Sequence, residues 1–279
     1  METVCRVGDL ALSARERRPA GAPRGIVLAL HGGGYGAGYW DYPPTSLLDV
    51  AAERGHLGLA IDRLGYGAAF AQPMPLAAQA EMVLDLAAQL RRREGGAPLL
   101  LAGHSMGGIL ALLAAALPQA ADSVAAVDAC GVPLRYAEPM QAALDARRLA
   151  AGETHFRALD DDHARAAFFG VEEDFTAEAL AYDAALRVPV PGAELPDAAN
   201  APRDLPAVMR RIALPVRLSF AAQEASSIAN EAVAAEARAH LAASPRSLVR
   251  FEPRSGHNIS LHRGGRDFHH AMIDWLEAA

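Results

Sequence analysis

The stretch LLLAGHSMGGILALLAA, residues 99–115, decides the fold. It runs from an apolar segment through a serine flanked by glycines into an alanine-rich helical pattern. A strand that passes straight into a helix needs a tight turn, and Gly103 and Gly107 stand where side chains would collide with neighbouring backbone. The pattern predicts a strained turn with the Ser105 hydroxyl at its tip, over the N-terminus of the helix. Free N–H groups there favour a developing negative charge, so we predict that Ser105 is a nucleophile.

Apolar runs ending in turn residues alternate with helical patterns on both sides of this stretch. The expected strands lie within residues 25–34, 56–67, 97–105, 123–131, 214–224 and 247–257. The expected helices lie within residues 43–55, 75–96, 228–244 and 271–279. This alternation predicts an α/β fold with a mostly parallel central sheet and helices on both faces. The first two dozen residues are expected to form an antiparallel hairpin at the sheet edge.

The rhythm breaks after Val132. Residues 132–210 are rich in Ala, Asp, Glu and Arg, contain helical stretches, and include no convincing strand. We predict an α/β core made of residues 1–131 and 211–279, with residues 132–210 inserted as a helical cap. The acidic run at residues 159–175 is expected to be a solvated helix face, because it lacks the fixed ligand spacing of a metal site.

Composition excludes several classes of function. The net charge is −7 and all 26 basic residues are arginines, which leaves no basic face for nucleic acid. No apolar run approaches the roughly 18 to 20 residues that a membrane span needs. The chain has two cysteines and no secretory pattern at its N-terminus, so we expect a cytoplasmic protein. A homo-oligomer is compatible with the sequence.

Four motifs together resemble the α/β-hydrolase fold family. GHSMGG (103–108) resembles its nucleophile elbow, HGGGYG (31–36) its oxyanion loop, DRLGYG (62–67) the turn after its fourth strand, and GHN (256–258) its catalytic-histidine turn. The resemblance covers residues 25–279 apart from the predicted cap. It implies a serine hydrolase fold whose chemistry needs no cofactor, and the sequence contains no metal-binding or nucleotide-binding motif.

A serine hydroxyl needs a general base near neutral pH, and imidazole is suited to take and return its proton. His257 is the best placed histidine, because it follows the last expected strand at a glycine turn and comes after Ser105 in chain order. His262, His269 and His270 lie further along, in or near a helix, and are expected at the surface.

The third catalytic residue orients the imidazole and has two candidates. In the commonest arrangement of the family the acid follows the strand after the cap, where this chain has AAQE, so the resemblance indicates Glu224. A minority of the family places the acid after the strand before the cap, where Asp128 stands in VDACG. Both stay open at this stage, with Glu224 preferred.

Two backbone N–H groups are needed where the charge of a tetrahedral intermediate develops. Met106 is expected to supply the first, and Gly33 in the glycine loop at residues 31–34 the second, with Gly34 beside it in the same oxyanion and substrate-binding site. His31 is expected to brace this loop, and Tyr35 to line the pocket beside it.

The leading hypothesis is a serine hydrolase that cleaves a carboxylic ester, lactone or thioester through an acyl-enzyme on Ser105. The composition of the predicted cap suggests a small-molecule acyl substrate of moderately apolar character. Candidates for the pocket wall are Met140, Phe168, Phe169 and Met209. Two alternatives remain: the same residues could run acyl transfer, cyclisation or elimination, or the fold could be a non-catalytic ligand-binding protein.

Overall fold

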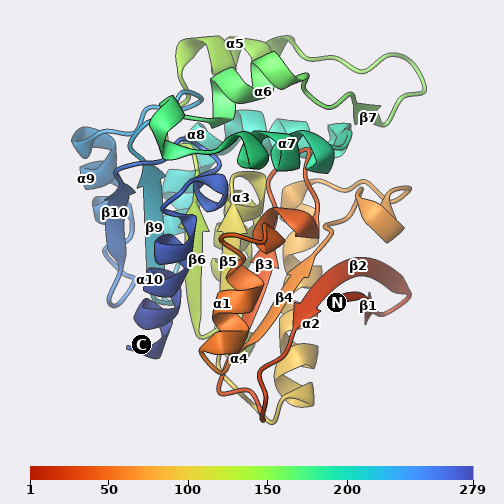
Figure 1. Cartoon of the computed structure of the whole chain (residues 1–279), viewed down its shortest axis with the longest axis vertical. Coiled ribbons are helices and arrows are strands. Elements are labelled where there is room, and N and C mark those ends of the chain that lie inside the picture. Colours follow the sequence, from red (N-terminus) through yellow and green to blue (C-terminus); the bar gives the residue numbers. More distant parts are fainter. Residues whose placement is uncertain (279) are drawn as a thin grey trace.

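The computed structural model describes residues 1–278 and has an eight-stranded sheet at its centre (Figure 1). The strand order across the sheet is β1-β2-β4-β3-β5-β6-β9-β10. The strands are β1 (Glu2–Val7), β2 (Leu10–Arg17), β3 (Ile26–Leu30), β4 (Leu57–Ile61), β5 (Leu99–His104), β6 (Ala126–Cys130), β9 (Val216–Ala221) and β10 (Leu248–Glu252).

The sheet is parallel except at one edge. β1 pairs antiparallel with β2, and β2 pairs antiparallel with β4. The pairs from β4 to β10 are all parallel. The predictions of a mostly parallel sheet and of an antiparallel hairpin at its edge are therefore confirmed.

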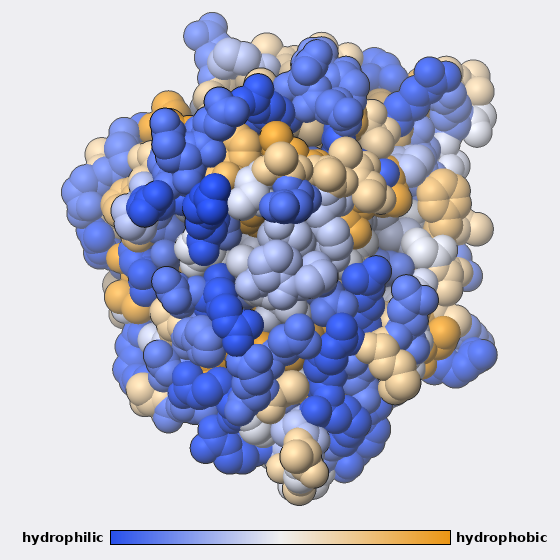
Figure 2. Space-filling view, in the orientation of Figure 1, coloured by the Kyte–Doolittle hydropathy of each residue, from blue (hydrophilic) through white to orange (hydrophobic). Residues whose placement is uncertain are grey.

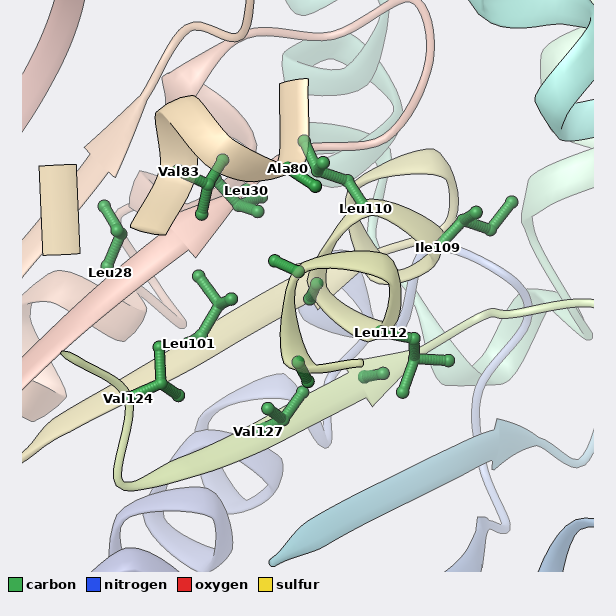
Figure 3. Close-up of a cluster of buried hydrophobic side chains, with 14 of the residues drawn as sticks. Leu28, Leu30, Ala80, Val83, Leu101, Ile109, Leu110, Leu112, Val124 and Val127 are labelled. Carbon is green, nitrogen blue, oxygen red and sulfur yellow. The ribbon is translucent and has the colours of Figure 1, made fainter. Parts of the chain in front are cut away.

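Helices cover both faces of the sheet because each strand buries side chains on both sides. On β3, Leu28 and Leu30 join a core with α2, α3, α8 and α9, whereas Val27 and Ala29 pack with α1 and α10. Figure 3 shows the first core between α2, α3 and the sheet. These helices are α1 (Leu47–Glu53), α2 (Leu76–Arg93), α3 (Met106–Ala115), α8 (Leu195–Met209), α9 (Glu231–His240) and α10 (Gly265–Glu277). The short helix α4 (Ala120–Ser123) contacts α2 and α3.

The remaining helices of the predicted insertion lie over one end of the sheet (Figure 1). They are α5 (Glu138–Ala146), α6 (Asp161–Phe168) and α7 (Ala177–Leu186). Two strands of two residues each, β7 (His155–Phe156) and β8 (Val190–Pro191), pair within this segment, where no strand was expected. Helix α8 also falls within residues 132–210, but it packs against α3, and its buried residues Ala201, Leu205, Val208 and Met209 belong to the core. The cap boundaries stay a prediction.

The surface is mainly hydrophilic on the face shown in Figure 2, and apolar residues gather mostly in its upper half, where α5 to α7 lie. Across residues 1–278, no helix combines the length and the apolar character that crossing a membrane requires.

Two histidines that were expected at the surface are buried. His262 and His269 are each 1% exposed, so that prediction is wrong for them, while His270 is half-buried. The Nδ1 atom of His269 lies 2.6 Å from the carbonyl oxygen of Thr45, and its Nε2 lies 3.0 Å from the hydroxyl of Ser260. The ring is thus fully paired inside the protein, on the face of α10 that packs against the sheet.

Burial of His269 predicts a pH dependence of stability. Burial lowers the pKa of His269 to about 3, from an ordinary value near 6.5. Between these values the unfolded chain binds a proton that the folded chain does not, so the free energy of unfolding falls as pH falls from 6.5, by up to about 1.4 kcal/mol per pH unit. Urea unfolding from pH 4 to 7 should show a smaller slope for His269→Gln than for wild type. His270→Gln, the control on the same helix, should keep the wild-type slope; equal slopes for all three proteins would contradict the prediction.

Candidate active site

Ser105 occupies a strained turn between β5 and α3. Its backbone has φ 54° and ψ −120°, in the left-handed region that side chains rarely adopt. A Cβ at Gly103 would lie 2.3 Å from the carbonyl oxygen of Gly107, and a Cβ at Gly107 would lie 2.3 Å from that of Leu30. Both positions therefore require glycine, as the sequence pattern predicts, and the turn is fixed by close backbone packing.

Glu224 and His257 form a direct contact beside this turn. Nδ1 of His257 lies 2.7 Å from Oε2 of Glu224, with both side chains buried. Oε1 of Glu224 accepts hydrogen bonds from the backbone N–H and the hydroxyl of Ser226, at 2.9 and 2.7 Å. Burial acts to raise the pKa of Glu224, but the charge of His257 and the hydrogen bonds from His257 and Ser226 outweigh it and hold that pKa below its usual value.

The ionised Glu224 fixes the tautomer of His257. A carboxylate only accepts hydrogen bonds, so in the neutral form of His257 it is Nδ1 that carries the proton and Nε2 that is free to accept one. His104 contacts the backbone of His257, because its Nε2–H donates to the carbonyl oxygen of His257 at 3.0 Å. Within residues 1–278 no hydrogen bond joins Ser105 to His257, although both line one cavity. Such contacts are often long without substrate and tighten when it binds.

Asp128 lies elsewhere and has a different partner. Its side chain is fully buried, and Oδ2 accepts a hydrogen bond from Nη1 of Arg217 at 2.5 Å. Burial raises the pKa of Asp128, against the opposing effect of the Arg217 charge. The structure thus brings Glu224 to His257 and pairs Asp128 with an arginine of β9.

The glycine loop after β3 faces the elbow. A Cβ at Gly33 would lie 2.5 Å from Sδ of Met106, so the loop passes directly over the start of α3. The N–H of Gly34, whose φ is 78°, donates to the phenolic oxygen of Tyr66 at 3.2 Å. The backbone N–H groups of Gly33 and Met106 have no hydrogen-bond acceptor among the described residues. Among residues 1–278, the N–H of Gly33, the predicted donor of the loop, is therefore free, while that of Gly34 is in use.

A buried ionic network supports the loop from below. His31 accepts the backbone N–H of Arg63 at Nε2 (3.1 Å), and its Nδ1 lies 2.7 Å from the carbonyl oxygen of Gly32. Burial and the Arg63 charge lower the pKa of His31 well below its ordinary value, so its ring is neutral. The Arg63 guanidinium pairs with Glu194, which also accepts from Tyr66 at 3.1 Å. His31 thus braces the loop as expected, through partners that the sequence did not reveal.

A second buried cluster joins the loop, the histidine turn and α7. Oδ1 of Asp183 accepts hydrogen bonds from the hydroxyl of Tyr35 at 2.7 Å and from the side-chain amide of Asn258 at 2.9 Å. The same amide lies 2.9 Å from the Tyr35 hydroxyl. Tyr35 and Asn258 are the immediate neighbours of Gly34 and His257, so the Asp183 carboxylate of α7 links the glycine loop to the histidine turn.

The cavity next to Ser105 has a volume of about 260 Å³. Its wall includes six of the residues predicted for the site, Ser105, Met106, Gly33, Gly34, Tyr35 and His257, whose roles stay predictions. Of the expected wall residues, Met140 and Phe168 line it. Phe169 instead packs against Phe175 and His262. Met209, the last residue of α8, is buried in the core, so the prediction is wrong for these two residues.

Comparison with known proteins gives one family and many similar folds. The model of the alpha/beta hydrolase family matches residues 26–270. No curated protein matches the chain. A thermophilic esterase from Thermogutta terrifontis is 18% identical with a TM-score of 0.69, over 100% of this chain and 98% of its own.

Two further solved structures are similar over nearly their whole length. A carboxyl esterase from Bacillus coagulans is 18% identical with a TM-score of 0.73, over 100% of this chain and 98% of its own. A monoglyceride lipase from Saccharomyces cerevisiae is 14% identical with a TM-score of 0.73, over 99% and 94%. At these identities the structures show a shared fold, and the family match covers most of the sequence. The chain belongs to the alpha/beta hydrolase family.

Proposed function

We propose that this protein is a serine hydrolase that cleaves a carboxylic ester, lactone or thioester through an acyl-enzyme on Ser105. The observation that carries the proposal is the 2.7 Å contact between Glu224 and His257 at the cavity that Ser105 lines. A nucleophile, a base and a residue that orients the base are what acyl transfer through a serine requires.

The reaction proceeds in two halves. The Ser105 hydroxyl attacks the carbonyl carbon, and its proton passes to Nε2 of His257. The resulting imidazolium gives this proton to the leaving alcohol or thiol as the carbon–oxygen or carbon–sulfur bond breaks. Water then attacks the acyl-enzyme, again losing its proton to His257, and Ser105 leaves with the proton returned. Glu224 stays ionised throughout and stabilises the imidazolium.

The N–H groups of Met106 and Gly33 are the proposed donors to the negatively charged oxygen of the intermediate. Their lack of a partner within residues 1–278 supports this role, because a donor already in use would gain nothing when the oxyanion forms. Each such donor typically stabilises the transition state by roughly 3 to 4 kcal/mol. The small, largely apolar cavity supports a small acyl group as substrate.

Labelling with a fluorophosphonate tests the proposal without knowledge of the substrate. Wild-type protein should gain the mass of one phosphonyl group at Ser105, because only an activated serine reacts. Ser105→Ala should gain none, and Glu224→Gln should react far more slowly. Intact-protein and peptide mass spectrometry give the readout, with Asp128→Asn as the matched carboxylate control. Absence of labelling in the folded wild-type protein would contradict the proposal.

A further inference from the structure

The cavity at Ser105 is lined by cationic side chains and by no acidic one among residues 1–278. Arg147 and Arg187 contribute guanidinium groups to its wall, whereas the other lining residues are mainly apolar. A guanidinium forms its strongest pairs with carboxylates. It therefore matters which of the two arginines already has such a partner.

Arg187 already has carboxylate partners. Its Nε lies 3.1 Å from Oδ2 of Asp183, and its Nη2 pairs with Asp161. These two carboxylates balance the charge of Arg187 at the cavity wall.

Arg147 is different. Within residues 1–278 it has no carboxylate within 4.0 Å, and its guanidinium makes no hydrogen bond, so its donors are free. The guanidinium carbon lies 5.1 Å from the ring centroid of Phe156 in β7, a contact that positions the cation without neutralising it. Burial lowers the pKa of Arg147, yet an arginine stays charged at neutral pH.

The place of Arg147 separates it from the reacting groups. It directly follows α5, which Figure 1 shows in the layer farthest from the sheet, whereas Ser105 lies at the carboxyl end of β5. The α5 residues that share the cavity wall with it, Met140, Ala143 and Leu144, are apolar. A ligand that reaches from Ser105 to Arg147 therefore meets apolar surface and then a free guanidinium.

We propose that the substrate is an acyl ester or thioester whose acyl chain ends in a carboxylate, and that Arg147 binds this carboxylate. A half-ester of a short dicarboxylic acid has this chemistry. The planar fork of a guanidinium matches a carboxylate with two parallel hydrogen bonds, which gives both affinity and orientation. The inference rests on the proposed function, because it assigns the substrate class of the same site.

Binding to Ser105→Ala protein tests the assignment without turnover. The probes are the monomethyl and dimethyl esters of succinate, glutarate and adipate, which within each pair differ by one negative charge. Calorimetry should show the best monomethyl ester binding at least about 10-fold more tightly than its dimethyl ester, as a charge-assisted pair predicts. Arg147→Gln in the same background should abolish the preference, and Arg147→Lys should retain part of it.

Arg148→Gln is the matched control, because it removes the same charge one residue away at an exposed position. It should keep the preference for the monomethyl ester. Equal affinities for the two esters, no binding of either, or a preference that survives Arg147→Gln would each overturn the proposal. A charge preference that depends on Arg147, in a protein that fluorophosphonate does not label, would confirm the carboxylate contact at Arg147 and reject the hydrolase function, and with it the ester or thioester as substrate.

Discussion

Replacing Glu224 by glutamine is expected to lower kcat for ester hydrolysis by about 10⁴-fold. The two donors of Ser226 hold one side-chain oxygen of residue 224, so the amide nitrogen of the glutamine would face Nδ1 of His257. That nitrogen donates, which forces Nδ1 to accept and places the ring proton on Nε2, towards the cavity. His257 then cannot take the proton of Ser105. Steady-state kinetics with a p-nitrophenyl ester, corrected for active sites by titration, measure the effect.

Asp128→Asn provides the comparison, since it neutralises a second buried carboxylate, which lies on the inner strand β6. Asp128 pairs with Arg217 and, within residues 1–278, forms no hydrogen bond or ion pair with His257, so kcat of the folded variant should stay near the wild-type value. Its stability should fall, because Arg217 keeps its buried charge and loses a partner. A large loss of kcat in Asp128→Asn together with a near-normal Glu224→Gln would assign the acid to Asp128.

The second large effect is expected on stability, from Glu194→Gln. Arg63 and Glu194 are both fully buried, and the substitution leaves the guanidinium without a counter-charge. Removing one partner of a buried pair typically lowers the free energy of unfolding by about 3 to 5 kcal/mol. Glu194 also accepts from Tyr66 and from the Gln79 side chain, so further hydrogen bonds weaken. Urea denaturation monitored by circular dichroism gives the free energy.

Asp204→Asn is the control for this prediction, because it makes a comparable charge change in an exposed pair with Arg203 on α8. Exposed pairs contribute at most about 1 kcal/mol, so little should be lost. If both variants lost a similar free energy of unfolding, the buried pair would contribute no more to stability than the exposed pair, which would contradict the prediction. Glu194→Gln combined with Arg63→Met should be less destabilised than the sum of the single variants, since no unpaired charge remains.

The sequence predicted those features that depend on local pattern. The strands, the crossover helices and the elbow around Ser105 follow from apolar runs and glycines within short windows, and all six strands expected outside the edge hairpin are present. His257 and Glu224 were identified through chain order and resemblance, and the structure places them 2.7 Å apart. Their catalytic roles stay predictions until the variants are measured.

Contacts between distant residues left no local signal. Arg63 and Glu194 are 131 positions apart, and Tyr35 and Asp183 are 148 apart, so neither pair could be inferred from spacing. Each pair also has one member within residues 132–210, where the sequence lacks the alternation of strand and helix patterns seen elsewhere. That the N–H of Gly33 and the guanidinium of Arg147 have no partner within residues 1–278 can be established only from the three-dimensional structure.

The burial of His269, in contrast, did have a signal in the sequence. His269 lies three, four and seven positions before Met272, Ile273 and Leu276, which is the spacing of one helix face, and all four are buried. The polar character of histidine led to a surface assignment, although a ring with two hydrogen-bond partners can be buried. Helical periodicity is the better guide where it conflicts with residue type.

The hydrogen bonds of Asp183 tie α7 to the residues around Ser105. A displacement of α7 would break its contacts with Tyr35 and Asn258, the neighbours of Gly34 and His257. Helix α5 buries none of its side chains and α6 buries only Ala164, so few packing contacts hold them in place. We therefore expect the local opening that admits a ligand to be concentrated in α5 and α6, with α7 moving less.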